Sequence, residues 1–558
     1  MGVPRFFKWL LEKFKKNILL KKLDFPVEHL YIDANCLFHP ECQKIKEKYM
    51  DGGCTDDELE KEMFEQITKY LDYLEDYVKP TKTMNIFVDG VAPLAKITQQ
   101  RKRRYKTMYD IEKINEIKIK HGVKLDKLSW TNICITPATK FMERLNKHLI
   151  KHYNKKKNDK IKYIYSSYHV AGEGEHKIFN HIKERLTKKD NIVIYGLDAD
   201  LIFLSMISRC NVYLLREEIH LNNVKTGNMI YVSIYETKNA LVNEIIYLLN
   251  DDECFNDIFK KNINILINDF IVLCFLLGND FLPHFIAVDI YNDGLTILLN
   301  HYIGCIKLCY TPLTYHDDEQ NVKINMKFIT LLFKYLCNEE KYNVIIPNNY
   351  IKSINRKCNA KNEYEKEKWN FENLIYDDPI GLSNVKNYEK YYKYFFDCSI
   401  KDSVKSYLKS IIWVTNYYFN NKTDWQYSYE YEYAPLIKDI YEYLNNYIDD
   451  INDINDYKFN ENNKINPLIQ LITVIPEKYS EMLLPKEIHK YITKNDKMKN
   501  KIYPKNTKLY TAYKHMFWQC SPVLPSLKIK YLENKIKKIK FSSKSEKLNM
   551  INEKNIMF

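Results

Sequence analysis

The chain has 558 residues, enough for two to four domains, and its 85 Lys and Arg against 72 Asp and Glu give a formal net charge of +13. This basic balance suits a polyanionic partner, because phosphate contacts dominate affinity for nucleic acids. The 13 cysteines form no CxxC pair, which argues against a zinc site or a disulfide framework. No signal peptide or membrane-length apolar run is present. We therefore expect an intracellular, membrane-free protein with reduced cysteines.

Strands and helices are predicted to alternate in the first 300 residues. Buried strands are expected at 29–33, 84–89, 162–167 and 191–198, and helices near 57–78, 94–118, 138–152 and 174–187. This alternation is typical of an α/β fold, a parallel sheet with helices on its faces.

The rest of the chain changes in character along its length. A helix is expected from 262 to Leu277 with Gly278 as its stop, so that residues 1–310 form the first region. Irregular linker is expected over 311–381. Residues 382–525 are aromatic-rich and expected to form a mostly helical second region packed against the first. The Lys-rich segment 526–558 is expected to be either a basic helix or a disordered tail.

Seven carboxylates stand where apolar segments end, and two pairs of them have i, i+2 spacing, in GEGEH and GLDAD. They are Asp33, Asp89, Glu173, Glu175, Asp198, Asp200 and Asp280. Any single one could simply cap the following helix. Because functional groups of such sheets gather beyond the carboxyl ends of the strands, we expect all seven at one edge. Residues two apart diverge on a regular helix, so the pairs require a strand end or a glycine-flanked turn.

Anions held this close repel one another, and divalent cations relieve that repulsion. Hard oxygen ligands select Mg²⁺ or Mn²⁺ over zinc. Two such ions about 4 Å apart activate a water and stabilise the leaving oxygen in phosphodiester hydrolysis, so we expect a two-metal nuclease.

A basic helical face follows Asp89 directly. Pro93 suits a first helical turn, and the polar residues after it share one face. They are Lys96, Gln100, Arg103, Arg104 and Thr107. The alternatives are a solvated basic face or a nuclear-localisation patch. Beside a metal centre we interpret this face as a phosphate pocket, since arginine binds phosphate oxygens in a bidentate way.

These motifs resemble the XRN family of 5′-to-3′ exoribonucleases, relatives of flap endonucleases within the PIN-like nucleases. The matching stretches run from residue 1 to about 525, and the most specific are DGVAP, GEGEHK, GLDADL and GNDFLPH. Long members of the family continue with added β-domains, so from the resemblance we expect this chain to be a compact member. Its composition, with 46 tyrosines, is typical of an AT-rich genome such as that of a large DNA virus or a protist.

The resemblance implies a role for each matching position. The seven acids would bind metal and be catalytic, and Lys96, Gln100, Arg103 and Arg104 would hold a 5′-monophosphate. His39 would stack on the 5′ base with an aromatic ring of the second region, where Trp425 and Tyr427 replace the usual tryptophan pair. A core position is the plain alternative for His39.

We therefore expect processive digestion of single-stranded 5′-monophosphate RNA to mononucleotides in RNA turnover, by a monomer that is cytoplasmic rather than nuclear. Two alternatives stay open. A flap-type DNA nuclease would carry a duplex-binding helix–hairpin–helix signature, which is not evident. A catalytically inactive RNA-binding scaffold would have lost metal ligands, and none is missing.

Overall fold

The computed structural model divides the chain into two compact units. The helical unit comprises 1–15, 237–461 and 508–523, and the sheet unit comprises 16–236, 462–507 and 524–558. The structure describes residues 3, 5–49, 52–125, 130–157, 160–219, 225–250, 252–260, 262–290, 293–343, 358–373, 378–382, 384–447, 454, 457, 459–504, 507–514, 516–552 and 554–558. The boundaries differ from the four sequence ranges chiefly because 462–507 and 524–558 belong with the sheet.

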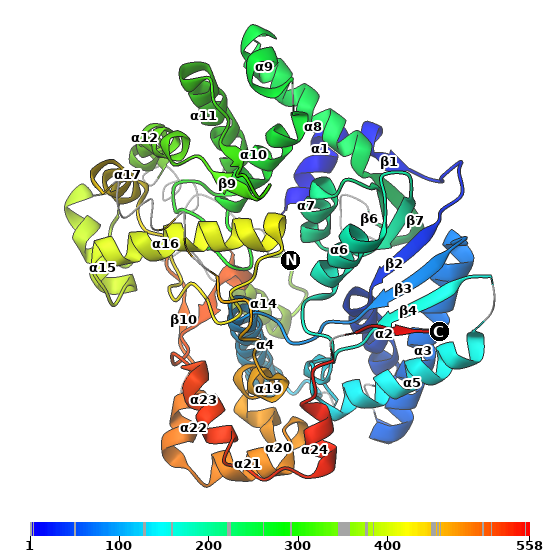
Figure 1. The fold of residues 1–558 in the computed structure, drawn as a ribbon. Coiled ribbons are helices and arrows are strands. Elements are labelled where there is room, and N and C mark those ends of the chain that lie inside the picture. The colour runs from blue at the N-terminus through cyan, green and yellow to red at the C-terminus, as the bar shows by residue number, and fades with distance from the viewer. Residues whose placement is uncertain are drawn as a thin grey trace. The chain divides into compact units, whose positions relative to one another are not determined.

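The sheet unit is built on eight strands in the order β1-β7-β6-β5-β2-β3-β4-β12 (Figure 1). Their bounds are β1 Leu19–Leu20, β2 His29–Asp33, β3 Thr83–Phe87, β4 Lys162–Ser166, β5 Asn191–Tyr195, β6 Asn211–Ile219, β7 Lys225–Ser233 and β12 Ile556–Met557. The four predicted strands are confirmed as β2 to β5, and they pair in parallel together with β6. The edge strands β1, β7 and β12 are antiparallel, so the sheet is mixed.

Helices flank this sheet and extend from it. They are α2 Ala34–Lys48, α3 Asp56–Val78, α4 Leu94–Lys120, α5 Lys140–Lys156, α6 Gly174–Arg185, α7 Ala199–Ile207, α19 Pro467–Val474, α20 Ser480–Leu483, α21 Lys486–Thr493, α22 Asp496–Ile502, α23 Ile529–Ile536 and α24 Ser543–Leu548. The four predicted helices correspond to α3, α4, α5 and α6. Alternate strand residues such as Leu30 and Ile32 join a core with α2, α3 and α5, whereas Tyr31 on the other face bonds His181 of α6 at 2.8 Å.

The helical unit confirms the expected helical second region. Its elements are α9 Asp252–Phe259, α10 Ile263–Phe275, α11 Gly294–Cys309, β8 Thr314–His316, β9 Val322–Ile324, α12 Met326–Asn343, α14 Glu363–Glu372, α15 Tyr388–Phe395, α16 Ile400–Thr415, a π-helix η4 at Asn416–Asn420, α17 Ile437–Asn446, β10 Leu509–Tyr510 and β11 Ser521–Pro522. Helices α1 Phe6–Ile18 and α8 Ile234–Leu249 cross the boundaries between the units. After α10 the backbone turns at Gly278, whose φ of +86° favours glycine, as the predicted helix stop requires.

One expectation about irregular structure needs correction. The described part of 311–381 forms a β-hairpin and two helices instead of loops, because Phe328, Leu332 and Leu336 recur every four residues and bury one face of α12. For the Lys-rich segment, the helical one of the two expected alternatives is confirmed: it forms α23, α24 and the short strand β12, and Leu532 of α23 is buried in the core of the sheet unit. No described helix combines the length and the apolar run that crossing a lipid bilayer requires.

Candidate metal centre and phosphate pocket

Carboxylates from three segments meet at the carboxyl edge of the parallel strands. Asp33 ends β2, Asp89 follows β3 by two residues, and Glu175 lies in the first turn of α6. One oxygen from each lies within 4.8 Å of the other two. The same limit relates Glu173, Glu175 and His176, and also Asp33, Cys36 and Asp198. The strand register brings this about, since Asp33 pairs with Phe87 directly before Val88 and Asp89.

The acids lie at helix N-termini rather than at strand ends alone. Asp33, Glu173 and Asp198 occupy the capping positions of α2, α6 and α7, and among the described residues none of the three caps its helix with its side chain. Both i, i+2 pairs therefore straddle a helix start, where the partial positive charge of the helix stabilises anions. Asp89 does act as a cap, because its Oδ1 accepts the Gly174 N–H at 2.7 Å.

Burial makes the charged form of these carboxylates costly. Desolvation, reinforced by the charge of Asp89, raises the pKa of Asp33. Desolvation likewise raises the pKa values of Asp89 and Glu175, with Glu173 adding to both. Asp33 is 2% exposed, and its Oδ1 has no hydrogen-bond partner among the described residues. An oxygen-rich cluster with an unsatisfied buried acceptor fits a hard divalent cation.

One lysine and one thiol contact this cluster, and a second lysine interacts with it electrostatically. Lys96 Nζ lies 2.5 Å from Glu173 Oε2, so the lysine that we assigned to the phosphate pocket pairs with a metal-centre acid. Lys177 is buried, and desolvation lowers its pKa to about 7 against the opposing effect of Asp89 and Asp33. Cys36 Sγ donates to Asp33 Oδ2 at 2.9 Å.

The two remaining predicted acids occupy different units. Asp200 is buried in the first turn of α7, two residues after Asp198. Asp280 follows the Gly278 turn and belongs to the helical unit. The sheet unit alone therefore contains six of the seven acids.

The basic face of α4 is only partly solvent-exposed. Gln100 and Arg104 are buried, whereas Arg103 is exposed. Arg104 Nη1 has no hydrogen-bond partner among the described residues, and burial, reinforced by Arg103, lowers the pKa of Arg104 to about 9. A buried, unpartnered guanidinium nitrogen is costly unless an anion reaches it.

His39 of α2 belongs to the same environment. Burial is the main cause that lowers the pKa of His39 to about 4, and the charges of Arg103 and Arg104 lower it further. Asp198 acts in the opposite direction. The ring is therefore neutral near pH 7, and charges of both α4 and the acid cluster act on it.

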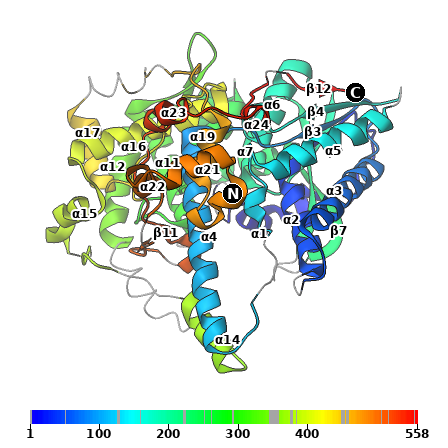
Figure 2. The ribbon, with the colours of Figure 1, turned by 90° about the horizontal axis from the view of Figure 1, so that it is seen from below.

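Helix α4 is held by the segments that return to the sheet unit late in the chain (Figure 2). Arg101 donates to the carbonyl oxygens of Ile502 at 2.8 Å and Pro525 at 2.7 Å. Gln470 of α19 accepts the Ala92 N–H at 2.9 Å and donates to Gln100 Oε1 at 3.3 Å. The basic residues thus stand on a helix fixed at both its start and its middle.

The two candidate stacking rings differ in their surroundings within the helical unit. The Tyr427 hydroxyl bonds Ser410 Oγ at 2.6 Å and the Ser406 carbonyl oxygen at 3.1 Å, and its ring lies 6.2 Å from that of Trp413. Trp425 is half-buried, and among the described residues no aromatic ring or cation lies on it. Tyr427 is thus fixed by two hydrogen bonds of its hydroxyl, whereas Trp425 keeps part of its surface exposed.

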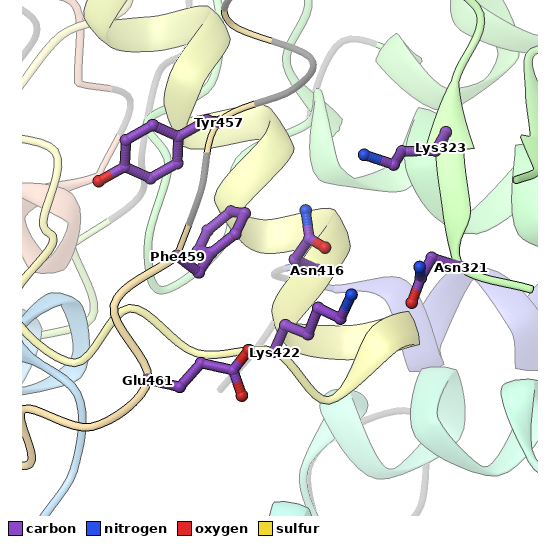
Figure 3. A pocket seen from close by; sticks show the side chains of 7 residues that line it. All are labelled: Asn321, Lys323, Asn416, Lys422, Tyr457, Phe459 and Glu461. Carbon is purple, nitrogen blue, oxygen red and sulfur yellow. The ribbon is translucent and has the colours of Figure 1, made fainter. Parts of the chain in front are cut away.

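A separate cavity of about 290 Å³ lies in the helical unit (Figure 3). Its lining is Asn321, Lys323, Asn416, Lys422, Tyr457, Phe459 and Glu461. Only one of these residues is acidic, so this cavity offers no carboxylate cluster.

Sequence reasoning missed several neighbours of the acids. Asn35 accepts the Asp89 N–H at 3.1 Å, and Cys36, His176 and Lys177 contact or adjoin the cluster. Arg216 of β6 is buried, and the charge of Asp198 opposes the lowering of its pKa to about 10 by burial. The signal for the first four was their position inside DANC and GEGEHK.

Comparisons with known proteins agree with these features. Residues 1–218 match the family model described as XRN 5'-3' exonuclease N-terminus, and residues 260–368 and 337–558 match the model described as Xrn1 helical domain. The chain is 29% identical to 5'-3' exoribonuclease 1 of Homo sapiens, with 98% of this chain and 34% of that protein covered. It is 25% identical to the Schizosaccharomyces pombe 5'-3' exoribonuclease 1, covering 94% of this chain and 47% of that protein.

The chain thus spans between 34% and 47% of the length of these two relatives. The 5'-3' exoribonuclease 2 homolog of Drosophila melanogaster is 25% identical, with 94% of this chain and 69% of that protein covered. Among solved structures, the catalytic core of Rad2 in complex with DNA aligns with a TM-score of 0.31 and 12% identity over 73% of this chain and 94% of that chain. That score is too low to support a conclusion.

The raised pKa values give the metal-free protein a defined pH dependence. The folded state holds a proton on Asp33 up to pH about 8, whereas the unfolded chain loses it near pH 4, so stability falls as pH rises through this window. In EDTA we expect the melting temperature to decrease between pH 6 and pH 9, and Mg²⁺ to restore it most at pH 9. Asp33→Asn should flatten the slope, whereas Asp57→Asn at an exposed site should not. A melting temperature that changes neither with pH nor with Mg²⁺ would contradict the raised pKa of Asp33.

Proposed function

Because the chain belongs to the XRN 5'-3' exonuclease family, we propose that it hydrolyses single-stranded RNA processively from a 5′-monophosphate end, releasing mononucleotides. One observation carries the proposal: the buried carboxylates Asp33, Asp89 and Glu175 occur in the same unit as Arg104 of α4, a buried arginine whose Nη1 has no hydrogen-bond partner among the described residues. The first suits phosphodiester hydrolysis and the second suits recognition of a terminal phosphate.

The acids would hold two hard divalent cations, Mg²⁺ or Mn²⁺. Asp33, Asp89, Glu173, Glu175, Asp198 and Asp200 are the sheet-unit ligands of this proposal, and Asp280 is its seventh member. Such ions supply Lewis acidity and an activated water at neutral pH. The chain's own part is to fix the carboxylates at helix starts and to exclude bulk water by burial.

Direction would come from α4. Arg104 and Gln100 are buried, so a terminal phosphate would be bound in a desolvated place where a charge-assisted bond is strong. A triphosphate or a cap would add bulk and charge that a buried guanidinium pocket does not accommodate. Lys96 would divide its charge between the phosphate and Glu173, which would link end recognition to the metal centre.

Stacking would make digestion independent of sequence. The neutral ring of His39 and the half-buried indole of Trp425 are the rings we assign, and an aromatic ring contributes ~1–3 kcal/mol per stacked base whatever the base is. Tyr427 is better suited to packing, because its hydroxyl is bonded to Ser410 and Ser406.

One assay tests the activity. Purified protein is offered linear 5′-monophosphate RNA, 5′-triphosphate RNA, circular RNA and a DNA flap, with Mg²⁺ and with EDTA. We expect mononucleotides from the monophosphate RNA alone, and only with Mg²⁺. Loss of circular RNA would contradict an exonuclease, flap cleavage would favour a DNA nuclease, and binding without cleavage would favour an inactive scaffold.

The phosphate pocket has its own test. Arg104→Ala should reduce the preference for monophosphate over triphosphate RNA by about 10- to 100-fold, because a charge-assisted hydrogen bond is worth about 1.5–3 kcal/mol. Lys120→Ala removes a cation from the far end of the same helix and should leave the preference unchanged. Kinetics on the two substrates measure the ratio, and an unchanged ratio for Arg104→Ala would remove this residue from the pocket.

A further inference from the structure

The loop between β4 and α6, residues 167–172, leads directly into the two glutamates of GEGEH. A buried lysine of α6 lies against this loop. Lys177 is 7% exposed, and its Nζ donates to the carbonyl oxygens of Ser167 and Val170, both at 3.1 Å. Lysine is rarely buried to this extent unless its donors are satisfied. Both carbonyl oxygens that accept from Lys177 Nζ belong to the loop.

The same residue is tied to the glutamates through the backbone. The Lys177 N–H donates to the Glu173 carbonyl oxygen at 3.0 Å, in the first turn of α6. The side chain of Lys177 therefore contacts the loop from the helix turn that begins at Glu173. A shift of the loop relative to α6 would have to break the bonds of Lys177 or move that turn.

Gly172 leaves room for the lysine stem. A Cβ on Gly172 would lie 3.1 Å from Lys177 Cγ, and the φ of +114° is one that other residues rarely adopt. The Gly172 N–H donates to the Val91 carbonyl oxygen at 2.8 Å, and the Gly172 carbonyl oxygen accepts the Gly90 N–H at 2.9 Å. The loop is thus joined on one side to the segment that carries Asp89 and on another to Lys177.

The far side of the loop is held as well. The Asn552 N–H donates to the His169 carbonyl oxygen at 2.8 Å, and His169 Nδ1 lies 2.9 Å from the Met550 carbonyl oxygen. On the α6 side, the side chain of Lys177 holds the loop through its bonds to Ser167 and Val170.

We infer that Lys177 is a positioning residue, which sets the place of Glu173 and Glu175 by fastening the 167–172 loop to the first turn of α6. The expected effect on kcat rests on the proposed function, whereas the contacts of Lys177 with the loop do not depend on it. The carbonyl oxygens of Ser167 and Val170 need two N–H donors, and the Lys177 side chain has at least two whether it is protonated or neutral. The residue acts through the glutamates, and such outer partners of metal ligands typically affect affinity or activity 10- to 100-fold.

The test compares Lys177→Met with Lys183→Met. Methionine keeps an unbranched stem beside Gly172 but leaves the two carbonyls without their donor. Lys183 is an exposed lysine of the same helix and serves as the matched control. For Lys177→Met we expect kcat on monophosphate RNA to fall about 10- to 100-fold with little change in KM, and Mn²⁺ affinity, measured by calorimetry without RNA, to weaken. Lys183→Met should match the parent chain in all three.

Gly172→Ala provides a second variant in case Lys177→Met does not fold, as judged by its near-ultraviolet circular dichroism. The added Cβ pushes on the Lys177 stem and should give the same kcat loss and weaker Mn²⁺ binding. Parent-like kcat and Mn²⁺ affinity in whichever of the two variants fold would overturn the inference. If the parent chain itself fails to digest RNA, the proposed function fails, and Mn²⁺ calorimetry still decides the role of Lys177.

Discussion

The burial of several carboxylates close together is the constraint on which the rest of the sheet unit depends. Asp33, Asp89 and Glu175 have raised pKa values mainly because burial removes water from them, and their neighbours add to the effect. Three features offset this cost within the chain. Helix starts face the acids, Lys96 pairs with Glu173, and Lys177 lies close by. Divalent cations would offset the remainder.

The same edge of the sheet brings opposite charges near each other. Asp198 acts electrostatically on His39, which in turn is affected by Arg103 and Arg104 of α4. His39 is therefore affected by the charge of one of the clustered acids and by two cations of α4. Under the proposed function, this would give a physical basis for coupling recognition of an RNA end to hydrolysis of its first bond.

Local patterns predicted the part of the fold that local forces decide. Continuous apolar runs predicted β2 to β5, and the acids at their ends predicted the edge at which Asp33, Asp89 and Glu175 meet. The spacing argument correctly kept the acid pairs out of helix interiors, and the structure places them at helix N-termini, the position that the capping alternative had named for single acids. Pairing between strands far apart in the sequence was harder to predict. Strand β12 has only two residues and is stabilised by its pairing with β4, almost 400 positions earlier in the chain. The high lysine content of 526–558 also obscured Ile529, Leu532 and Ile536, which bury one face of α23.

The choice between stacking rings shows a further limit of sequence reasoning. Trp425 and Tyr427 are equivalent in a sequence motif, and only the hydroxyl contacts of Tyr427 with Ser410 and Ser406 separate them. Likewise, a basic face was evident on α4, but which of its residues are buried depends on Gln470 and on the carbonyls of Ile502 and Pro525.

Anomalous diffraction from Mn²⁺-soaked crystals tests the metal role of the acid cluster most directly. We expect Mn²⁺ peaks within coordination distance of the carboxylate oxygens of Asp33, Asp89 and Glu175, and none in crystals of Asp33→Asn. Full Mn²⁺ occupancy elsewhere with these three carboxylates unliganded would contradict a metal-dependent nuclease centre at this edge of the sheet.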